Sequence, residues 1–329
     1  MKRKVYSFNS ELYKVTGVQK VMLDVHHAVR GEYEAKIVGT IPFDSIHTDL
    51  QIKKDEYVRF CSPFQFRKSI VIFHERKFSM LFWILNHLLF QKIKLVYVHH
   101  NMLYGHRFMT RLPKHIVAIS EAGIRNLTEY FGAPKEHITK IYNCVKDIHP
   151  HPHSYNGTLP ITLLLSARIN EIKQQIELVK QLRGKLSLKV RILFAGIGPD
   201  YERLKKLTKG DEQFVTLGYR SDVYDLLAKC DYMLLFSKHE GLPITLIEAD
   251  MTGTPVICNN VGGNIEIVHD GENGFIVNNW PALIELLNSL EDITNDEYLQ
   301  MSRRGREIYE QNFTFEKFKC NYLKLLEKI

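Results

Sequence analysis

The 329-residue sequence has little cysteine, and it lacks the spacings that cysteine-based sites need. With an odd number of scattered cysteines and no Cys-x-x-Cys pair, a disulfide framework and a structural zinc site are not expected, and a reducing compartment is indicated. The five cysteines are Cys61, Cys144, Cys230, Cys258 and Cys320. Hydrophobic residues make up 45% of the chain, enough for two domains with packed cores.

Long hydrophobic runs are also missing. The longest apolar stretch, 78–90, is interrupted by Ser79, Asn86 and His87 and is too short to span a bilayer, so it predicts a buried helix, with an interfacial membrane helix as the alternative. The charged start of the chain, 1–8, lacks the apolar core of a signal peptide. We therefore expect a cytoplasmic protein, with peripheral contact at the inner membrane face left open.

Acidic residues are outnumbered, and the net charge is +7. This excess permits nucleic acid, an anionic membrane surface or a phosphorylated substrate as a partner. The basic residues are spread along the chain in short runs, such as those at 2–4 and 303–304, and no aromatic–basic ribbon occurs. Nucleic acid is therefore not expected as a partner.

Internal repeats and low-complexity tracts are absent, and two short motifs predict little. The His-Pro-His-Pro-His segment at 149–153 is expected to be an extended, solvated linker rather than a metal site, because alternating prolines let its histidines share a face only loosely. Sequons at Asn126, Asn156 and Asn312 are attributed to chance without a secretion signal.

Short β-branched or aromatic runs alternate with helical patterns along the chain, which is typical of parallel α/β domains. The first series has expected strands at 4–8, 35–39, 70–73, 94–99 and 115–119, and helices at 17–29, 78–90 and 121–131. The second has expected strands at 161–166, 190–195, 214–217, 232–236, 255–258 and 274–277, and helices at 173–183, 201–206, 223–228, 243–251 and 281–290.

The α/β pattern restarts after a proline-containing segment, 146–160, which reads as a linker. We therefore predict two doubly wound, Rossmann-like domains facing a cleft. Their expected limits are 1–147 and 148–313, and a helix at about 314–329 is expected to pack back on the first domain. Ligands of such sheets bind beyond the carboxyl ends of the strands.

The most informative stretch runs from Ser237 to Ala249. An apolar strand ends in a polar turn, and Pro243 suits the first position of the helix that follows. Gly241 permits close backbone approach, and the free N–H groups around Leu242 to Thr245 form an anion site at the helix start. Glu240 in the turn and Glu248 in the helix bracket this site.

Two cations are predicted to face the same site. Arg168 follows the first strand of the second domain, and Lys173 is expected to begin the next helix. A pyrophosphate is bound well by a guanidinium fork together with an ammonium point charge. The combination therefore predicts a phosphate-bearing ligand, whereas either feature alone could be a surface charge or a solvated carboxylate.

The motifs Glu240-Gly-Leu-Pro-Ile-Thr-Leu-Ile-Glu248-Ala, Gly253-Thr-Pro-Val-Ile, Gly262-Gly-Asn-Ile-Glu266 and Asp270-Gly-Glu-Asn-Gly-Phe resemble glycosyltransferase family 4, also called group 1. The resemblance covers most of 110–329 and the first hundred residues loosely. It implies the GT-B fold and retaining transfer from a nucleotide sugar, such as a UDP-sugar, to a saccharide or lipid-linked acceptor in polysaccharide or glycolipid biosynthesis.

The resemblance also implies roles for individual residues. Glu248 would bind the ribose hydroxyls and Glu240 the donor sugar, while Arg168 and Lys173 would clamp the diphosphate with no metal or other cofactor. Backbone near Tyr219 and Arg220 would receive the base. The family's glycine before the arginine is Ala167 here, a small change.

In the first domain, the loop at Gly17 resembles the one that approaches the donor phosphates, although this chain has one glycine where the family often has two. His100 resembles the family's histidine near the reaction centre. His99 should point to the other face of the sheet, and His74 is a weaker candidate.

Three other functions share some of these features. A dehydrogenase is disfavoured because Gly196-Ile-Gly198-Pro-Asp-Tyr201 breaks the dinucleotide motif at its third glycine. A sugar-nucleotide epimerase of the same fold and a non-catalytic nucleotide-sugar-binding protein stay open as alternatives. The donor base, the sugar, the acceptor and the oligomeric state are not determined by the sequence.

Overall fold

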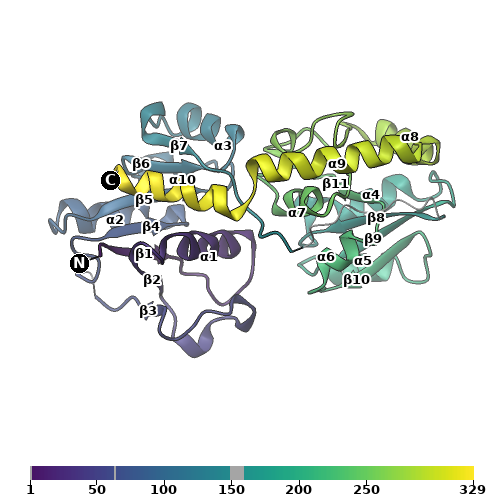
Figure 1. Ribbon diagram of the computed structural model, residues 1–329. Coiled ribbons are helices and arrows are strands. Elements are labelled where there is room, and N and C mark those ends of the chain that lie inside the picture. Colours follow the sequence, from purple (N-terminus) through teal and green to yellow (C-terminus); the bar gives the residue numbers. More distant parts are fainter. Residues whose placement is uncertain (1, 63, 149–158) are drawn as a thin grey trace. The chain divides into compact units, whose positions relative to one another are not determined.

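The computed structural model describes residues 2–62, 64–148 and 159–329. The chain forms two compact units (Figure 1): unit 1 comprises Met1–Cys144 and Phe315–Ile329, and unit 2 comprises Val145–Thr314. The sequence predicted boundaries after residues 147 and 313. That the first part binds the acceptor and the second part the nucleotide-sugar donor stays a prediction. The histidines of 149–153 and the Asn156 sequon lie outside the described residues.

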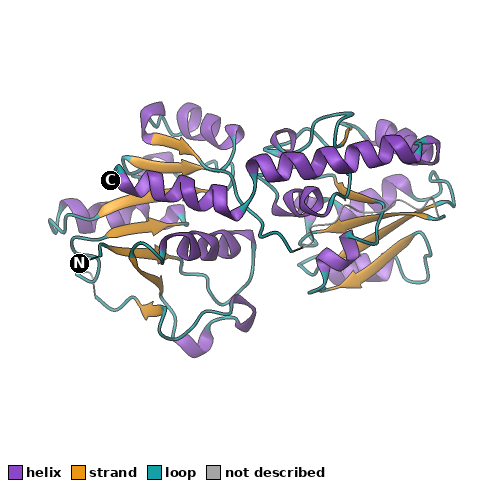
Figure 2. Ribbon diagram, in the orientation of Figure 1, coloured by secondary structure: helices purple, strands orange, loops and turns teal. Residues whose placement is uncertain are grey.

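Unit 1 is built on a parallel sheet with the strand order β3-β2-β1-β4-β5-β6-β7 (Figure 2). The five inner strands are short and rich in buried β-branched or aromatic residues, as expected for a sheet that is covered on both faces, whereas the edge strands β3 and β7 have no buried residue. The strands are β1 Lys4–Phe8, β2 Glu34–Gly39, β3 Tyr57–Arg59, β4 Ile70–Phe73, β5 Lys94–His99, β6 His115–Ala118 and β7 Ile138–Lys140.

Four α-helices accompany this sheet among the described residues: α1 Gly17–Val29, α2 Ser79–His87, α3 Glu121–Arg125 and α10 Phe315–Glu327. The core contains a dense aromatic cluster in which Phe8, Phe66 and Phe82 pack edge to face. The last helix, α10, packs against α1 and buries Leu326 completely.

Unit 2 repeats the arrangement with a parallel sheet of order β10-β9-β8-β11-β12-β13. Its strands are β8 Ile161–Ser166, β9 Val190–Ala195, β10 Phe214–Gly218, β11 Tyr232–Leu235, β12 Val256–Cys258 and β13 Gly274–Ile276. Its α-helices are α4 Gln175–Leu182, α5 Tyr201–Leu207, α6 Val223–Leu227, α7 Ile244–Thr252, α8 Trp280–Ser289 and α9 Asn295–Asn312.

Both sheets reverse their strand order at one point. In unit 1 the reversal falls between β1 and β4, and in unit 2 it falls between β8 and β11. Loops that leave neighbouring strands at such a point diverge to opposite faces, which opens a crevice at the carboxyl edge of the sheet. The two switch points therefore mark where each unit can bind a ligand. The predicted fold class, α/β with two doubly wound sheets, is confirmed.

The structure corrects several local predictions. The short strands β3 and β7 were missed, and the helix expected at 121–131 is α3 followed by a π-helical turn, Asn126–Tyr130. Lys173 does not begin an α-helix: it ends a 3₁₀ turn, and Gln174 has a left-handed backbone before α4. Pro243 is the N-cap of α7 rather than its first residue. Ser120 caps α3, as expected for a serine at that position.

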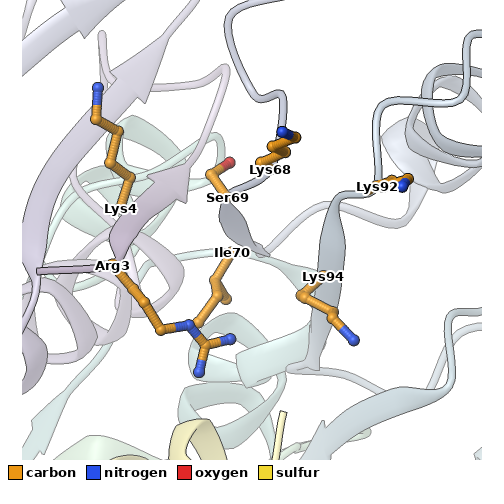
Figure 3. Close-up of a pocket in the computed structure, with 7 residues that line it drawn as sticks. All are labelled: Arg3, Lys4, Lys68, Ser69, Ile70, Lys92 and Lys94. Atoms are coloured by element: carbon orange, nitrogen blue, oxygen red, sulfur yellow. The ribbon is translucent and has the colours of Figure 1, made fainter. Parts of the chain in front are cut away.

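The amino edge of the unit 1 sheet carries a small hollow of about 140 Å³ (Figure 3). It is formed by the first residues of three neighbouring strands, β1, β4 and β5, and by the residues just before them. Most of the side chains around it are cationic. The residues that line it are Arg3, Lys4, Lys68, Ser69, Ile70, Lys92 and Lys94.

Replacing Leu326 by alanine is expected to destabilise unit 1 by about 2–5 kcal/mol, because it leaves a cavity between α10 and the rest of the unit. Urea unfolding followed by tryptophan fluorescence in a Trp280→Phe background measures this, since Trp83 is then the sole tryptophan and lies in unit 1. Lys324→Ala on the exposed face of α10 is the control. Equal midpoints for the two variants would contradict the packing described for α10.

Candidate functional site

Two predicted site residues meet at the switch point of unit 2. Lys173 Nζ lies 2.5 Å from Glu240 Oε1. Lys173 lies in the loop after β8 and Glu240 in the loop after β11, and these two strands are neighbours in the sheet. The carboxylate of Glu240 is almost fully buried, so the lysine gives it the charged partner that a buried carboxylate needs.

Backbone and side-chain hydrogen bonds hold the same two loops together. The backbone N–H of Lys238 donates to the carbonyl of Ile172 over 2.8 Å, and the Gln174 amide donates to the carbonyl of Phe236 over 3.2 Å. An exposed ion pair of 2.6 Å joins Lys238 to Glu171 beside them. The position of Lys173 against Glu240 is therefore fixed by several contacts.

A third loop supports Glu240 from the side of β12. Gly262 has a positive φ of 57°, and a Cβ at this position would lie 1.9 Å from the carbonyl oxygen of Glu240. The next residue, Gly263, donates its N–H to the carbonyl of Gly241 over 2.9 Å. Only glycine permits so close an approach in this backbone conformation, so Gly262 sets the position of the Glu240 turn.

Arg168 is exposed in the loop after β8, and among the described residues its side chain forms no hydrogen bond or ion pair. The backbone on either side is held against the loop after β9. Ala167 donates to Ala195, Ile169 donates to Ile197, and a Cβ on Gly196 would lie 2.1 Å from the Ala167 carbonyl oxygen. A free guanidinium on a fixed backbone is well placed to bind an anion.

The start of α7 lies directly after Glu240. Gly241, Leu242 and Pro243 are buried, Ile244 is the first helical residue, and Pro243 provides no side-chain cap. The positive end of the helix is therefore left for a ligand or solvent. Within α7 the carboxylate of Glu248 accepts a hydrogen bond of 3.4 Å from the hydroxyl of Tyr224.

The residues predicted to receive the base lie after β10. Gly218 has a positive φ of 75° at the end of this strand, and the side chain of Tyr219 is largely exposed. Arg220 donates from Nε to Asp222 Oδ1 over 2.8 Å, and this bond raises the pKa of the arginine and lowers the pKa of the aspartate.

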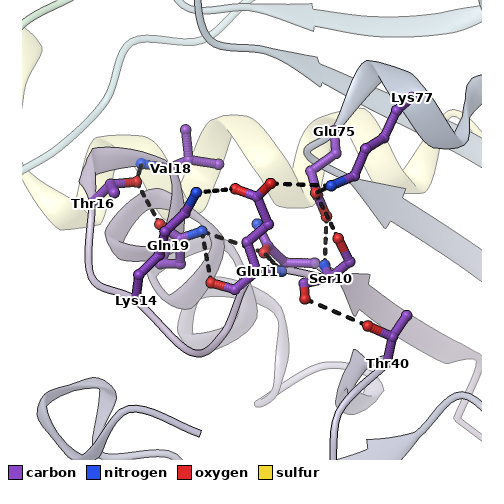
Figure 4. A network of polar contacts seen from close by, with 10 residues as sticks. Ser10, Glu11, Lys14, Thr16, Val18, Gln19, Thr40, Glu75 and Lys77 are labelled. Atoms are coloured by element: carbon purple, nitrogen blue, oxygen red, sulfur yellow. Dashed lines mark hydrogen bonds and ion pairs between the residues drawn. The ribbon is translucent and has the colours of Figure 1, made fainter.

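Unit 1 has a polar network at its own switch point (Figure 4). Ser10, after β1, donates its backbone N–H and its hydroxyl to the carboxylate of Glu75, after β4. Lys77 Nζ bridges Glu75 at 2.8 Å and Glu11 at 3.1 Å, and Lys14 Nζ lies 2.5 Å from Glu11. The hydrogen bond from Lys14 is the largest contribution to a lowered pKa of Glu11. This network was not predicted from the sequence.

Gly17 is the first residue of α1, and Thr16 is its N-cap. The Thr16 hydroxyl accepts a hydrogen bond of 3.3 Å from the N–H of Val18. The buried side chain of Gln19 donates to Asn9 and to the carbonyl of Glu11, so this helix start is tied to the network after β1.

His74 and His100 form a buried pair at the carboxyl ends of β4 and β5. His74 Nδ1 lies 2.9 Å from His100 Nε2, so one imidazole donates to the other. Burial lowers the pKa of His100 to about 3 and the pKa of His74 well below its ordinary value, so both rings are neutral near pH 7. His99 has different partners, Tyr97 and Asn126.

Within the described part of the chain, no group of three or more histidine, cysteine, aspartate or glutamate side chains is arranged to hold a metal ion. The same residues contain no helix with the length and apolar character needed to cross a membrane.

Residues 153–308 match the family described as glycosyl transferases group 1. This region belongs to the group 1 glycosyl transferases. Among curated relatives, the N-acetyl-alpha-D-glucosaminyl L-malate synthase of Bacillus anthracis is 25% identical over 220 residues, which is 63% of this chain and 58% of the relative. The UDP-Gal:alpha-D-GlcNAc-diphosphoundecaprenol alpha-1,3-galactosyltransferase of Escherichia coli is 31% identical over 107 residues, which is 32% of this chain and 27% of the relative. The chain thus spans 58% or less of these relatives.

Among solved structures, Anabaena HepE in complex with UDP is similar with a TM-score of 0.84 and 17% sequence identity, covering 99% of this chain and 100% of that one. This likeness shows the GT-B fold, as the sequence predicted. The UDP belongs to HepE, and at this identity the likeness shows the fold alone.

The glycosyl transferase region brings together Lys173, Glu240 and the start of α7, whereas the side chain of Arg168 has no ion-pair partner within the described residues and Glu248 is bonded to Tyr224. The supporting residues were not assigned from the sequence. Gly262 and Gly196 each begin a glycine motif that was noted in the sequence. Their close approach to the loops that contain Glu240 and Ala167 depends on the strand order, which the sequence does not show. The Glu75–Lys77 network of unit 1 had no signal beyond its place after an expected strand.

The buried histidines predict that unit 1 becomes less stable as the pH falls. Histidines of the unfolded chain titrate near pH 6.5, whereas the folded pKa values are about 4 for His99 and about 3 for His100. Between these values the unfolded state binds more protons than the folded state. The stabilising contribution of each such histidine is therefore fully present above about pH 6.5, and below it the free energy of unfolding falls by up to about 1.4 kcal/mol per pH unit for each histidine.

Urea unfolding of the Trp280→Phe protein between pH 7 and 4 tests this. His100→Gln should reduce the slope by about one proton, and His106→Asn on the surface should not; equal slopes for all three would contradict it.

Proposed function

We propose that this chain is a retaining glycosyltransferase of family 4 that moves a sugar from a nucleoside diphosphate sugar, such as a UDP-sugar, to a saccharide or lipid-linked acceptor. The observation that carries the proposal is the Lys173–Glu240 pair at the switch point of unit 2, directly before the uncapped start of α7. A cation, a carboxylate and a helix N-terminus together match a ligand that has both phosphates and hydroxyls.

The diphosphate would bind to Arg168, to Lys173 and to the first N–H groups of α7. Lys173 can do this without leaving Glu240, because an ammonium has three donors and the ion pair uses one of them. Arg168 would contribute its fork of donors from the same loop as Lys173. The carboxylate of Glu240 would accept hydrogen bonds from the donor sugar, and that of Glu248 would accept them from the ribose.

In the proposed reaction, the bond between the anomeric carbon and the diphosphate oxygen breaks. The acceptor oxygen bonds to the same face of that carbon, and its proton passes to the departing phosphate. The charge that develops on this phosphate is stabilised by Arg168, Lys173 and the helix dipole, so we propose that no metal or other cofactor is required. No protein nucleophile is assigned.

Unit 1 would contribute Gly17, at the start of α1, to the donor phosphates and His100 near the reaction centre. Because the imidazole of His100 is neutral near pH 7, its proposed role is a hydrogen bond to a sugar hydroxyl rather than a positive charge. The backbone near Tyr219 and Arg220 would receive the base. The name of the Escherichia coli relative includes a diphosphoundecaprenol substrate, which supports a lipid-linked acceptor. We propose that the chain acts at the cytoplasmic face of a membrane.

Replacing Arg168 or Lys173 by alanine is expected to reduce donor turnover by about 10²–10³-fold, because each removes a donor that stabilises the leaving diphosphate. Release of nucleoside diphosphate from the accepted donor measures turnover. Lys238→Ala is the matched control, since this lysine lies in the same pair of loops but forms an exposed ion pair with Glu171. It should change turnover by no more than about twofold. Turnover near the wild-type value in both Arg168→Ala and Lys173→Ala would disprove the clamp.

Glu248→Gln is expected to weaken donor binding by about tenfold to a hundredfold, because charge-assisted bonds to the ribose hydroxyls are lost. A thermal-shift screen over nucleotide sugars identifies the donor, since a ligand of the native state raises the midpoint. The variant is then compared at matched donor concentrations, with Glu285→Gln on the exposed face of α8 as the control. Unchanged donor affinity in Glu248→Gln would remove this residue from the site.

The same two measurements separate the transferase from a binding protein, and identification of the sugar that remains on the donor detects an epimerase. A non-catalytic binding protein would show the thermal shift and no release of nucleoside diphosphate with any acceptor. An epimerase would change the donor sugar without consuming an acceptor.

A further inference from the structure

The amino edge of the unit 1 sheet joins a cluster of cations to a cluster of exposed apolar side chains. The cations surround the hollow of Figure 3, and the apolar side chains belong to the segment that links α2 to β5. We call the two clusters together the basic–apolar surface. Its members are Arg3, Lys4, Lys68, Leu88, Leu89, Phe90, Lys92 and Lys94.

Backbone hydrogen bonds place the two clusters side by side. The N–H of Lys68 donates to the carbonyl of Gln91, and the N–H of Lys94 donates to the carbonyl of Ser69, both over 2.9 Å. The apolar residues therefore lie directly beside the hollow. Their exposure is large: the side chain of Phe90 is 79% exposed and that of Leu88 is 61% exposed. Contiguous exposed apolar groups of this kind usually mark a binding surface.

The backbone is strained where it displays these side chains. Lys68, Phe90 and Lys92 have positive φ angles of 56°, 48° and 55°. They are half of the non-glycine residues with a positive φ in the described chain. Such conformations are unfavourable for large side chains and are kept mainly where the surrounding structure or a function requires them. Here the strain turns an aromatic ring and a lysine outward in the same loop.

The surface has little negative charge. No aspartate or glutamate occurs between Glu75 and Glu121 in the sequence. Glu34 lies 3.9 Å from Lys4. Within the described chain, the other four cations of the surface form no ion pair. Their charge is therefore available to an anionic partner.

The arrangement of the cations distinguishes between kinds of anion. In Figure 3 the side chain of Lys4 extends away from those of Arg3 and Lys94, and the three cations do not converge on one point. A single phosphate needs convergent donors, whereas a lipid surface presents many phosphates over a wide area. The exposed leucines and Phe90 add apolar groups that can enter the boundary between headgroups and acyl chains.

We propose that the basic–apolar surface docks unit 1 on an anionic lipid bilayer, with its cations on lipid phosphates and Leu88, Leu89 and Phe90 in the interfacial layer. The surface lies at the opposite edge of the sheet from His74 and His100, so it anchors the protein rather than presenting a lipid to these histidines. The proposal goes beyond the transfer reaction and does not depend on it.

Co-sedimentation of the full chain with vesicles tests the proposal. The chain should bind vesicles of mixed phosphatidylglycerol and phosphatidylcholine, with an affinity that falls as salt is added, and should bind phosphatidylcholine alone far less. The triple variant Lys68→Gln, Lys92→Gln, Lys94→Gln should reduce partition by roughly a hundredfold, since each cation near such a surface contributes about fivefold. Phe90→Asn should reduce partition by about tenfold, and asparagine tolerates the left-handed backbone.

Matched controls keep net charge and aromatic content the same as in these variants. Lys185→Gln, Lys206→Gln, Lys209→Gln removes three exposed lysines of unit 2, and Phe108→Asn removes a phenylalanine that is 89% exposed elsewhere in unit 1. Both controls should bind vesicles as the wild type does. Circular dichroism and donor affinity should be unchanged in every variant, which separates a lost anchor from a lost fold or a lost donor site.

Four outcomes would overturn the proposal. One is no binding of the wild type to anionic vesicles at low salt. Another is equal losses in the test and control variants, which would indicate charge alone or a different loop. A third is binding of a DNA or RNA oligonucleotide, but not of vesicles, by the same lysines. The last is a dimer in sedimentation-velocity runs that Phe90→Asn dissociates, which would make the surface an interface between two copies of the chain.

Discussion

The candidate site of unit 2 depends on the ion pair between Lys173 and Glu240, because it joins the loops that leave β8 and β11 where the strand order reverses. Glu240 is buried, and a buried carboxylate that loses its partner destabilises the structure strongly. The pair therefore stabilises the crevice and also fixes an ammonium group in it. Since two of the three N–H donors of that ammonium are not used by the ion pair, Lys173 can stabilise the fold and bind the proposed ligand at the same time.

Much of unit 2 could be predicted from the sequence, because its signals are local. Short apolar runs marked β8, β9 and β11, and the turn before α7 carries its own motif. The contact between Lys173 and Glu240 could not be derived in this way, since 67 residues separate them and the strand order brings them together. The left-handed Gln174, which follows the 3₁₀ turn and precedes α4, also gave no signal because glutamine rarely adopts this conformation.

Unit 1 shows the same limit. The sequence predicted His100 as a site residue and His74 as a weaker candidate. It could not predict that the two histidines are partners, because each one only follows an expected strand. The parallel pairing of β4 with β5 makes them partners, and burial keeps both neutral. The three-residue strands β3 and β7 were missed because so short a run has no clear period. The helix expected at 78–90 ends at His87. The exposed residues that follow it, Leu88, Leu89 and Phe90, belong to the basic–apolar surface.

The pairing of charges distinguishes the two edges of the unit 1 sheet. At the carboxyl edge, Lys14 and Lys77 are bound to carboxylates that hold the loops after β1 and β4, so these cations are already used by the fold. At the amino edge, Lys68 and Lys92 have no carboxylate partner within the described residues, and the backbone is strained to display them. Arg168 in unit 2 also has no ion-pair partner among the described residues, but it lies in the same loop as Lys173, whose partner Glu240 directly precedes the start of α7. A fixed, convergent site selects a small ligand, whereas unpaired and divergent cations suit an extended anionic surface.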